Sequence, residues 1–309
     1  MTFACGIVGA GTIGHGFAVS LVREGFSTAA FDLDPAATAL AAEAGAVPAA
    51  SLEELARFAD VVLLAVPDTP QIEAALEGGL TAGLRSGSVV VITSTVSPET
   101  PVEIERRLAP AGVGVLDAPL SGGPAKAAAG ELAIMVGGPE DVFERCRPVL
   151  EALASHLAHV GPIGHGQIAK LVNNLMGAVI AVGIAEGLTL AAKSGADVRA
   201  VCDAVAGGSG SSWILREWIP DTVFRGDYRR RFSLELMQKD MALISGLSRS
   251  LEVPTPALDV AAAAFERAIA AGYGGFDFSV VAALHAHEAG AELPGGPAPP
   301  PEALMQHDA

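Results

Sequence analysis

The stretch from Phe3 to Gly14, which reads FACGIVGAGTIG, decides the fold. Its apolar run over 3–9 ends in glycine, helical spacing follows over 12–24, and a second apolar run lies at 28–32. This order predicts a strand, a turn, a helix and a second strand, which together make a βαβ unit. Because the GxGxxG pattern ends the first strand and begins the helix, it predicts a dinucleotide-binding turn rather than a plain glycine turn.

Each position of this glycine turn has a physical role. Gly9 permits the tight turn, Gly11 lets the backbone approach a pyrophosphate, and Gly14 allows close packing of the helix on the strand. The first amide groups of a helix have no partner within the helix, so they can bind phosphates. The predicted cofactor-binding residues of the turn are Gly9, Gly11, Thr12, Ile13 and Gly14.

A carboxylate at the end of the second strand indicates which dinucleotide is preferred. Asp32 can accept hydrogen bonds from the adenosine ribose hydroxyls, and it would repel a 2′-phosphate. No Arg or Lys follows it, because the next residues are Leu33, Asp34 and Pro35. The sequence therefore predicts Asp32 as a cofactor-binding residue and NAD as the cofactor, with NADP disfavoured. Asp32 could instead cap the following helix, but Asp34 suits that role better.

The rest of the first half of the chain alternates strands with helices. The predicted helices cover 36–45, 52–58, 70–77, 98–109 and 139–154. The predicted strands cover 46–48, 61–67, 88–93, 113–117 and 132–138. Such alternation is typical of a parallel, doubly wound sheet with helices on both faces, so we predict a Rossmann-type α/β domain.

The character of the sequence changes after 161–166, where turn-forming residues are dense. Residues 167–288 contain long Ala- and Leu-rich helical segments and no convincing strand. We therefore predict a NAD-binding Rossmann domain over 1–163 and an all-helical substrate and oligomerisation domain over 164–288, joined by a long helix. The remaining segment, 289–309, is rich in Pro, Ala and Gly, and we predict a disordered tail there.

Composition and charge exclude several classes of protein. The chain carries a formal net charge of −16, which repels nucleic acid. Its three cysteines are far apart and its seven histidines form no metal-binding spacing, so we predict a reducing compartment and no metal. We predict no secretory signal. Polar residues, among them Asn173 and Glu186, interrupt the apolar stretch 171–192, which favours a buried helix over a membrane span. These features predict a cytoplasmic protein.

Two further segments resemble those of a known family. Residues 117–124 read DAPLSGGP, and residues 161–174 read GPIGHGQIAKLVNN. With the N-terminal glycines and Lys239-Asp240, which looks like the family's KD pair, they resemble the β-hydroxyacid dehydrogenase family over about 3–288. That family includes 3-hydroxyisobutyrate dehydrogenase and tartronate semialdehyde reductase. The resemblance implies an NAD-binding domain like that of 6-phosphogluconate dehydrogenase. It also implies nicotinamide-side contacts from Val66, Pro67, Gln71, Thr95 and Lys239.

The residue types in these segments support the same chemistry. Ser121-Gly122-Gly123 is a small-residue turn that can point backbone N–H groups and a hydroxyl at one spot, which suits a carboxylate. Lys170 and Asn174 are four apart, so they project from one face of a helix. A lysine can exchange a proton with an alcohol or a carbonyl oxygen, and burial near a helix start would lower its pKa. We predict Lys170 as the catalytic residue. The predicted substrate-binding residues are Ser121, Gly122, Gly123 and Asn174.

These observations predict an NAD-dependent oxidoreductase that moves a hydride between nicotinamide and a small 3-hydroxy carboxylate such as 3-hydroxyisobutyrate. Tartronate semialdehyde, threonate-type and sulfolactaldehyde-type substrates stay open as alternatives on the same site. An imine reductase would lack the lysine, and a 6-phosphogluconate dehydrogenase would need a longer helical part. A non-catalytic NAD-binding scaffold protein would have lost Lys170 or the Ser-Gly-Gly turn. The apolar helical half also predicts a homo-oligomer, either a dimer or a tetramer.

Overall fold

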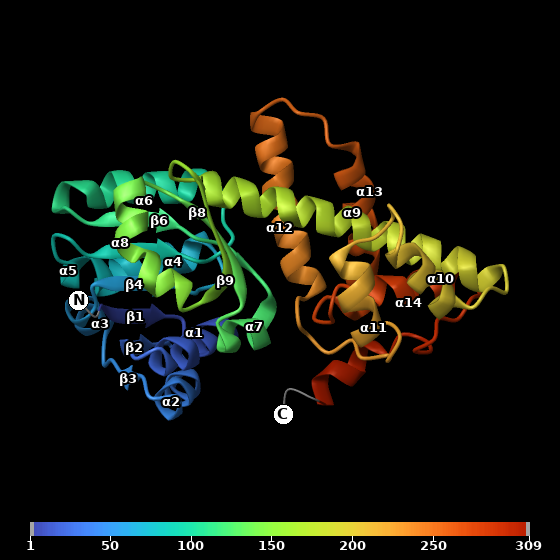
Figure 1. Cartoon of the computed structure of the whole chain (residues 1–309), viewed down its shortest axis with the longest axis horizontal. Coiled ribbons are helices and arrows are strands. Elements are labelled where there is room, and N and C mark those ends of the chain that lie inside the picture. The colour runs from blue at the N-terminus through green and yellow to red at the C-terminus, as the bar shows by residue number, and fades with distance from the viewer. Residues whose placement is uncertain (1–2, 307–309) are drawn as a thin grey trace. The chain divides into compact units, whose positions relative to one another are not determined.

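The computed structural model describes residues 3–306, and the chain divides into two compact units. Unit 1 is Met1–Lys170 and unit 2 is Leu171–Ala309 (Figure 1). The division falls inside the long helix α9 (His165–Lys193), whereas the predicted boundary lies in the turn before this helix. Unit 1 has α/β architecture, and the described part of unit 2 is helical, so the predicted fold class is confirmed.

Unit 1 is built on one sheet, which has nine strands among the described residues. The strands are β1 (Ala4–Val8), β2 (Ser27–Phe31), β3 (Val47–Pro48), β4 (Val61–Leu64), β5 (Val89–Ile92), β6 (Gly114–Asp117), β7 (Leu120–Ser121), β8 (Leu132–Gly137) and β9 (Ala154–Gly161). Their order is β3-β2-β1-β4-β5-β6-β8-β7, and β9 pairs with β8. The first six strands in this order pair in parallel, while β8 is antiparallel to β6 and β7.

Helices cover both faces of this sheet (Figure 1). They are α1 (Thr12–Arg23), α2 (Pro35–Glu43), α3 (Leu52–Phe58), α4 (Thr69–Ala75), α5 (Thr81–Gly83), α6 (Glu99–Leu108), α7 (Gly123–Ala129) and α8 (Glu140–Glu151). Alternate side chains of β4 divide between two cores, with Val61 and Leu63 in one and Val62 and Leu64 in the other. Helices α1, α2 and α8 complete the first core, and α3, α4 and α6 complete the second. Burial on both faces explains why the strand is apolar at every position.

Four of the named strands and helices of unit 1 are absent from the sequence-based prediction. They are the helices α5 and α7 and the strands β7 and β9. β7 has only two residues, and β9 reads ASHLAHVG with no fully buried side chain, so neither forms the continuous apolar run of a central strand. With β8, they make the far end of the sheet mixed. The sheet is therefore predominantly parallel, as predicted, with antiparallel pairs at that end.

Unit 2 is a bundle of helices around one apolar core. Its helices after α9 are α10 (Val198–Ala206), α11 (Ile219–Asp221), α12 (Leu234–Ser250), α13 (Pro256–Ala268) and α14 (Val280–Glu288). By length and composition alone, α9 is long and apolar enough to cross a membrane. Core helices of soluble proteins meet the same criterion. Residues Ala178, Ala185 and Leu188 of α9 belong to the core of unit 2.

The structure differs from the disordered tail predicted for 289–309. Residues 289–306 have described positions, and Leu293 is 3% exposed within the core of unit 2. Composition predicted disorder because Pro and Gly disfavour regular elements, but one apolar side chain can bury itself against a core without a regular element around it. Residues 307–309, which the prediction also covered, lie outside the described residues.

The three cysteines are buried free thiols. Burial raises the pKa of Cys5 and that of Cys146 to about 12, because the low-dielectric core disfavours a thiolate. These two side chains therefore act as small apolar core residues rather than as nucleophiles.

Candidate active site

The glycine turn lies where the connections between strands reverse direction. β1 has β2 on one side and β4 on the other, and ligands of open α/β sheets bind outside the carboxyl ends of the strands at such a point. The N–H of Gly9 donates to the carbonyl oxygen of Phe31 at 2.9 Å. A Cβ on Gly9 would lie 2.6 Å from the carbonyl oxygen of Ala65, just after β4. With a φ of 88°, Gly9 closes the turn between these two strand ends.

The other two glycines of the turn have opposite surroundings. A Cβ on Gly14 would overlap the carbonyl oxygen of Gly9, so α1 can approach β1 this closely only with glycine at this position. A Cβ on Gly11 would meet nothing within 4 Å, and Gly11 is exposed. Gly11 is also the N-cap of α1, and no side chain caps this helix. The first N–H groups of α1 and the open space beside Gly11 therefore fit the pyrophosphate of a dinucleotide.

Asp32 lies directly after β2, beside the glycine turn. One of its carboxylate oxygens accepts the N–H of Ala10 at 2.7 Å, and the other accepts the N–H of Asp34 at 2.9 Å. Asp34 is the N-cap of α2, and its carboxylate accepts the N–H of Ala36 at 2.9 Å. The two carboxylates therefore have separate roles: Asp34 caps α2, and Asp32 is held at the glycine turn.

Asp32→Asn is expected to reduce the preference for NAD over NADP, measured as the ratio of the two kcat/KM values. Like charges about 4 Å apart repel by roughly 1 kcal/mol even in water, so the ratio should fall by about fivefold or more. Asp34→Asn is the matched control, because it removes a carboxylate that caps α2 and should leave the ratio unchanged. A wild-type enzyme that used NADP as efficiently as NAD would contradict this role of Asp32.

The loops after β4 and β5 contain three of the five residues predicted on the nicotinamide side. Val66 and Pro67 follow β4, and Thr95 follows β5. The hydroxyl of Ser94 donates to the carbonyl oxygen of Val66 at 2.5 Å, which joins the two loops. Gln71 lies in α4 with an exposed side chain. The structure therefore brings Val66 and Thr95 onto the same edge of the sheet as the glycine turn.

Ser121, Gly122 and Gly123 form a junction between a strand and a helix. Ser121 ends β7, Gly122 is the N-cap of α7, and Gly123 is the first residue of that helix. The φ angles of Gly122 and Gly123 are 141° and 75°, a conformation that favours glycine. A Cβ on Gly16 of α1 would lie 2.6 Å from the Cβ of Ala127, so α7 packs directly on the helix that follows the glycine turn. All three residues of the junction are half-buried.

Lys170 and Asn174 lie one turn apart on α9, and they are 7% and 5% exposed. The side-chain Nδ2 of Asn174 donates to Oδ2 of Asp240 at 2.5 Å. The Nζ of Lys239 lies 3.1 Å from Oδ1 of the same carboxylate. The structure therefore joins Asn174 and Lys239 through Asp240, to which the sequence analysis gives no role of its own.

Asp117 is a second polar residue whose contacts the sequence analysis missed. It is fully buried at the end of β6, and its two oxygens accept the N–H groups of Gly164 and Gln167, each at 2.7 Å. Burial raises the pKa of Asp117, and the two backbone hydrogen bonds oppose that rise. No local pattern could reveal this contact, because the partners lie 47 and 50 residues further along the chain.

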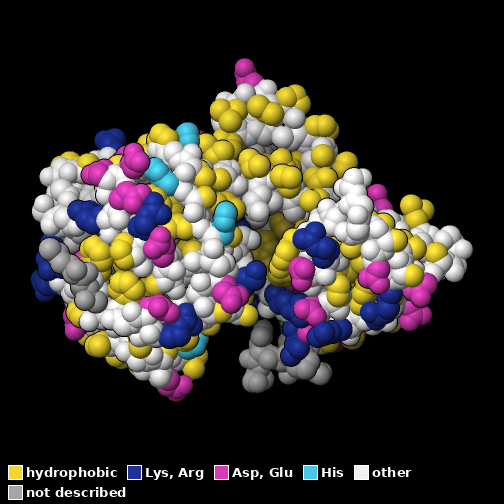
Figure 2. Space-filling view, in the orientation of Figure 1, with side chains coloured by type: hydrophobic (Ala, Val, Ile, Leu, Met, Phe, Trp, Pro, Cys, Tyr) yellow, Lys and Arg dark blue, Asp and Glu magenta, His cyan; other side chains and the backbone are white. Residues whose placement is uncertain are grey.

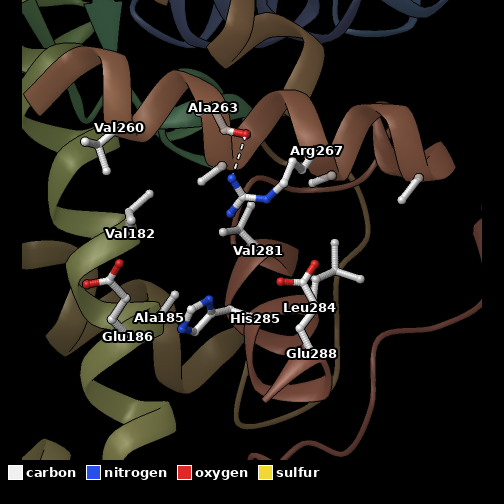
Figure 3. A pocket seen from close by; sticks show the side chains of 13 residues that line it. Val182, Ala185, Glu186, Val260, Ala263, Arg267, Val281, Leu284, His285 and Glu288 are labelled. Carbon is white, nitrogen blue, oxygen red and sulfur yellow. Dashed lines mark hydrogen bonds between the residues drawn. The ribbon is translucent and has the colours of Figure 1, made fainter. Parts of the chain in front are cut away.

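A cavity of about 290 Å³ lies in unit 2, between α9, α13 and α14. Figure 3 shows Arg267 in it, donating to the carbonyl oxygen of Ala263, with Glu186, His285 and Glu288 also on its walls. None of the predicted site residues lines this cavity, so it is not part of the candidate active site. Within residues 3–306, no group of three or more His, Cys, Asp and Glu side chains could hold a metal ion.

Two family models match the two parts of the chain. The model of the NAD-binding domain of 6-phosphogluconate dehydrogenase matches residues 4–161. The model described as the NAD-binding domain of NADP-dependent 3-hydroxyisobutyrate dehydrogenase matches residues 164–285. The first match ends just before α9 and the second begins there, close to the predicted domain boundary.

Relatives resemble the chain over almost its whole length. L-threonate dehydrogenase of Cupriavidus necator is 36% identical over 94% of this chain and 97% of its own. The mitochondrial 3-hydroxyisobutyrate dehydrogenase of Drosophila melanogaster is 31% identical over 89% of this chain and 87% of its own. The solved structure of Mycobacterium tuberculosis 3-hydroxyisobutyrate dehydrogenase with L-serine is 32% identical, with a TM-score of 0.85 over 92% of this chain and 99% of that one. This chain therefore belongs to the β-hydroxyacid dehydrogenase family and is an NAD-dependent dehydrogenase.

Proposed function

We propose that this protein transfers a hydride between NAD and a small 3-hydroxy carboxylate similar to 3-hydroxyisobutyrate, with Lys170 as the general acid–base. The observation that carries the proposal is the pair of buried polar side chains, Lys170 and Asn174, one turn apart on α9. Lysine is rarely this buried without a specific role, because burial disfavours its charge. The Ser121–Gly123 junction supports a carboxylate-bearing substrate, since it offers a hydroxyl and backbone N–H groups close together.

In the proposed reaction, Lys170 takes the proton of the substrate hydroxyl, and in the reverse direction it returns that proton to the carbonyl oxygen. Bound NAD supplies the hydride acceptor. Asn174 orients the substrate hydroxyl, and its own orientation is set on both sides: Nδ2 donates to Asp240, and Oδ1 accepts from Nδ2 of Asn173 at 2.9 Å. An amide has two hydrogens and two lone pairs, so one of each is left for the substrate.

A second candidate substrate is threonate. Relatives named L-threonate dehydrogenase, from Cupriavidus necator and from Escherichia coli K12, are each 36% identical to this chain. Tartronate semialdehyde and sulfolactaldehyde are further alternatives that the same lysine and anion site would serve. A scaffold protein that binds NAD without turnover is the non-enzymatic alternative.

The test measures the turnover of a panel of substrates. Each reaction is monitored through the absorbance of the reduced cofactor. 3-Hydroxyisobutyrate, L-serine and L-threonate are offered with NAD in the oxidative direction, and tartronate semialdehyde and sulfolactaldehyde with the reduced cofactor in the other. We expect the highest kcat/KM for 3-hydroxyisobutyrate, and a higher value for L-threonate would select the second candidate. NAD binding without turnover of any member would favour the scaffold protein.

Ser121→Ala is expected to raise KM for the acid substrate while leaving the affinity for NAD nearly unchanged. A charge-assisted hydrogen bond contributes about 1.5–3 kcal/mol, which corresponds to a KM increase of roughly 10-fold to 150-fold. The methyl ester of the best substrate serves as the matched chemical control, because it lacks the carboxylate charge and should react poorly with the wild type. Similar efficiency with the ester and the acid would rule out a carboxylate site here.

We also propose that the protein is cytoplasmic and forms a homo-oligomer, either a dimer or a tetramer. Exposed apolar side chains support association: Leu251, Val253 and Val260 are 61%, 52% and 61% exposed. Figure 2 shows hydrophobic side chains gathered over the turn between α12 and α13, where Leu251 and Val253 lie. An apolar surface that one copy cannot cover tends to be buried by a symmetric partner. A molar mass of one chain in light scattering would contradict the oligomer.

A further inference from the structure

We infer that Asp117 and Gln167 form a polar latch that holds the loop after β5 in a fixed position relative to Lys170. The latch consists of these two side chains and the backbone groups that they bind. Both are positioning residues, and their effect on the reaction rests on the proposed role of Lys170. The latch lies entirely within unit 1.

Gln167 holds the loop from both sides of Thr95. Its side chain is 0% exposed, and its Nε2 donates to the carbonyl oxygen of Ser94 at 2.9 Å. Its Oε1 accepts the N–H of Val96 at 3.0 Å. Because water does not reach this amide, no solvent molecule can replace either hydrogen bond. The loop that contains Thr95, a predicted nicotinamide-side contact, is therefore tied to the first turn of α9.

Asp117 ties the same turn of α9 to the end of β6. Its carboxylate accepts the N–H of Gln167 and the N–H of Gly164, each at 2.7 Å. Gln167 is thus held through its backbone by β6 and holds the β5 loop through its side chain. Lys170 follows three residues later on the same helix, so it cannot shift relative to Thr95 without straining at least one of these four hydrogen bonds.

Two glycines leave room for the buried carboxylate. A Cβ on Gly166 would lie 2.7 Å from Oδ2 of Asp117 and 2.5 Å from the carbonyl oxygen of Met135. A Cβ on Gly137 would overlap Oδ1 of Asp117. β8 and α9 therefore approach this carboxylate as closely as backbone atoms allow. This close packing explains glycine at two positions where the backbone itself needs no unusual φ.

The reaction rate depends on the latch because the proton acceptor and the nicotinamide must be held at a fixed distance and orientation relative to each other. Misplacement of reacting groups by about 1 Å can lower a rate by roughly 10²-fold. If the latch is broken, we expect kcat to fall while the KM values change little, because the residues proposed to bind the substrate carboxylate and the cofactor phosphates remain in place. A residue that only stabilised the fold would instead lower the amount of active protein.

The first experiment compares Gln167→Met, Gln167→Glu and the control Ser20→Ala, using 3-hydroxyisobutyrate and NAD. Ser20 is fully buried in unit 1, and its hydroxyl donates to the carbonyl oxygen of Ala152 at 2.7 Å. Ser20→Ala therefore also removes a hydrogen bond of a buried side chain, but neither partner of that bond belongs to the latch. We expect Gln167→Met to lower kcat by on the order of 10²-fold. Ser20→Ala should lower Tm by about as much as Gln167→Met does, but it should keep a normal kcat.

Gln167→Glu adds a pH readout. A protonated glutamic acid can donate to Ser94 as the amide does, whereas the ionised form places a carboxylate oxygen against a carbonyl oxygen. We expect kcat of this variant to fall as pH rises through an ionisation that the wild type lacks. Burial raises the pKa of an introduced carboxyl group, so this fall should begin above the usual range for glutamate.

The second experiment needs no substrate, so it stands even if the proposed function is wrong. Hydrogen exchange of the free protein is followed at the amide of Val96 in wild type and in Asp117→Asn. The Asp117 carboxylate accepts from Gly164 and Gln167, and the Val96 N–H donates to Gln167. The latch nevertheless predicts at least about tenfold faster exchange at Val96, because an Asn NH₂ group would face one of the two N–H donors of Asp117. Unchanged exchange at Val96 in Asp117→Asn would overturn the coupling. A kcat within twofold of wild type in Gln167→Met would overturn the positioning role.

Discussion

Lys170→Ala is expected to lower turnover by at least about 10²–10⁴-fold at saturating NAD, which is the usual contribution of a general acid–base. Departure of the hydride leaves positive charge on the alcohol oxygen unless a positioned group accepts the hydroxyl proton. Because Lys170 must be unprotonated to act in oxidation, wild-type oxidation should rise with pH through one ionisation, and the variant should lack it. NAD affinity should survive, since the glycine turn belongs to other elements of unit 1.

The Lys170→Arg variant distinguishes a role of Lys170 in proton transfer from a role of its positive charge alone. Guanidinium keeps its positive charge but does not release its proton in the working pH range, so this variant should be nearly as inactive as Lys170→Ala. Turnover and NAD affinity are measured for both variants, with circular dichroism to confirm folding. Near-normal turnover of Lys170→Arg would mean that Lys170 is only an electrostatic anchor and that the proton moves elsewhere.

Gly14→Ala and Gly11→Ala are expected to fail in different ways, although both alter the same turn. The methyl group at Gly14 would overlap a backbone carbonyl oxygen, which cannot move aside as a side chain could. We expect a loss of stability at or above the roughly 1–3 kcal/mol typical of overpacked cores. Each kcal/mol lowers Tm by roughly 2–4 °C in a domain of this size. Thermal unfolding of the free protein measures this effect.

Gly11→Ala is the matched variant, because its methyl group meets no protein atom within 4 Å and the φ of −64° suits alanine. The fold should therefore keep its Tm. The methyl group would instead occupy the space beside the N-terminus of α1, so we expect the Kd for NAD to rise at least about tenfold, a loss of about 1.4 kcal/mol. Calorimetric titration with NAD measures this Kd. Unchanged affinity in Gly11→Ala would show that the pyrophosphate does not bind at this turn.

The sequence predicts features that depend on short-range patterns. The βαβ unit around Gly9–Gly14 follows from apolar runs and glycine spacing, because a strand buried on both faces must be apolar and a tight turn must accept positive φ. Asp34 is recognisable as a helix cap for a similar reason, since a cap acts within three residues. The one-turn relation of Lys170 and Asn174 likewise follows from helix geometry alone.

The elements that the sequence analysis missed lack such a pattern. β9 lies at the far end of the sheet with side chains that are only partly buried, and β7 is too short for any periodicity. The segment 289–306 has the composition of a tail, yet Leu293 packs into the core of unit 2. In each case a contact with a distant element decided the structure, and composition alone could not predict that contact.

Sequence alone therefore determined the fold class, the glycine turn between β1 and α1, and the placement of Lys170 and Asn174 on one helix face. Only the tertiary structure decided how these groups are held. Asp117 reaches α9 across 47 residues, and Gln167 reaches the β5 loop across 71. Asn174 meets Asp240 across 66 residues. A hydrogen bond extends only about 3 Å, so which polar groups satisfy one another depends on where the folded chain places them, and not on their spacing in the sequence.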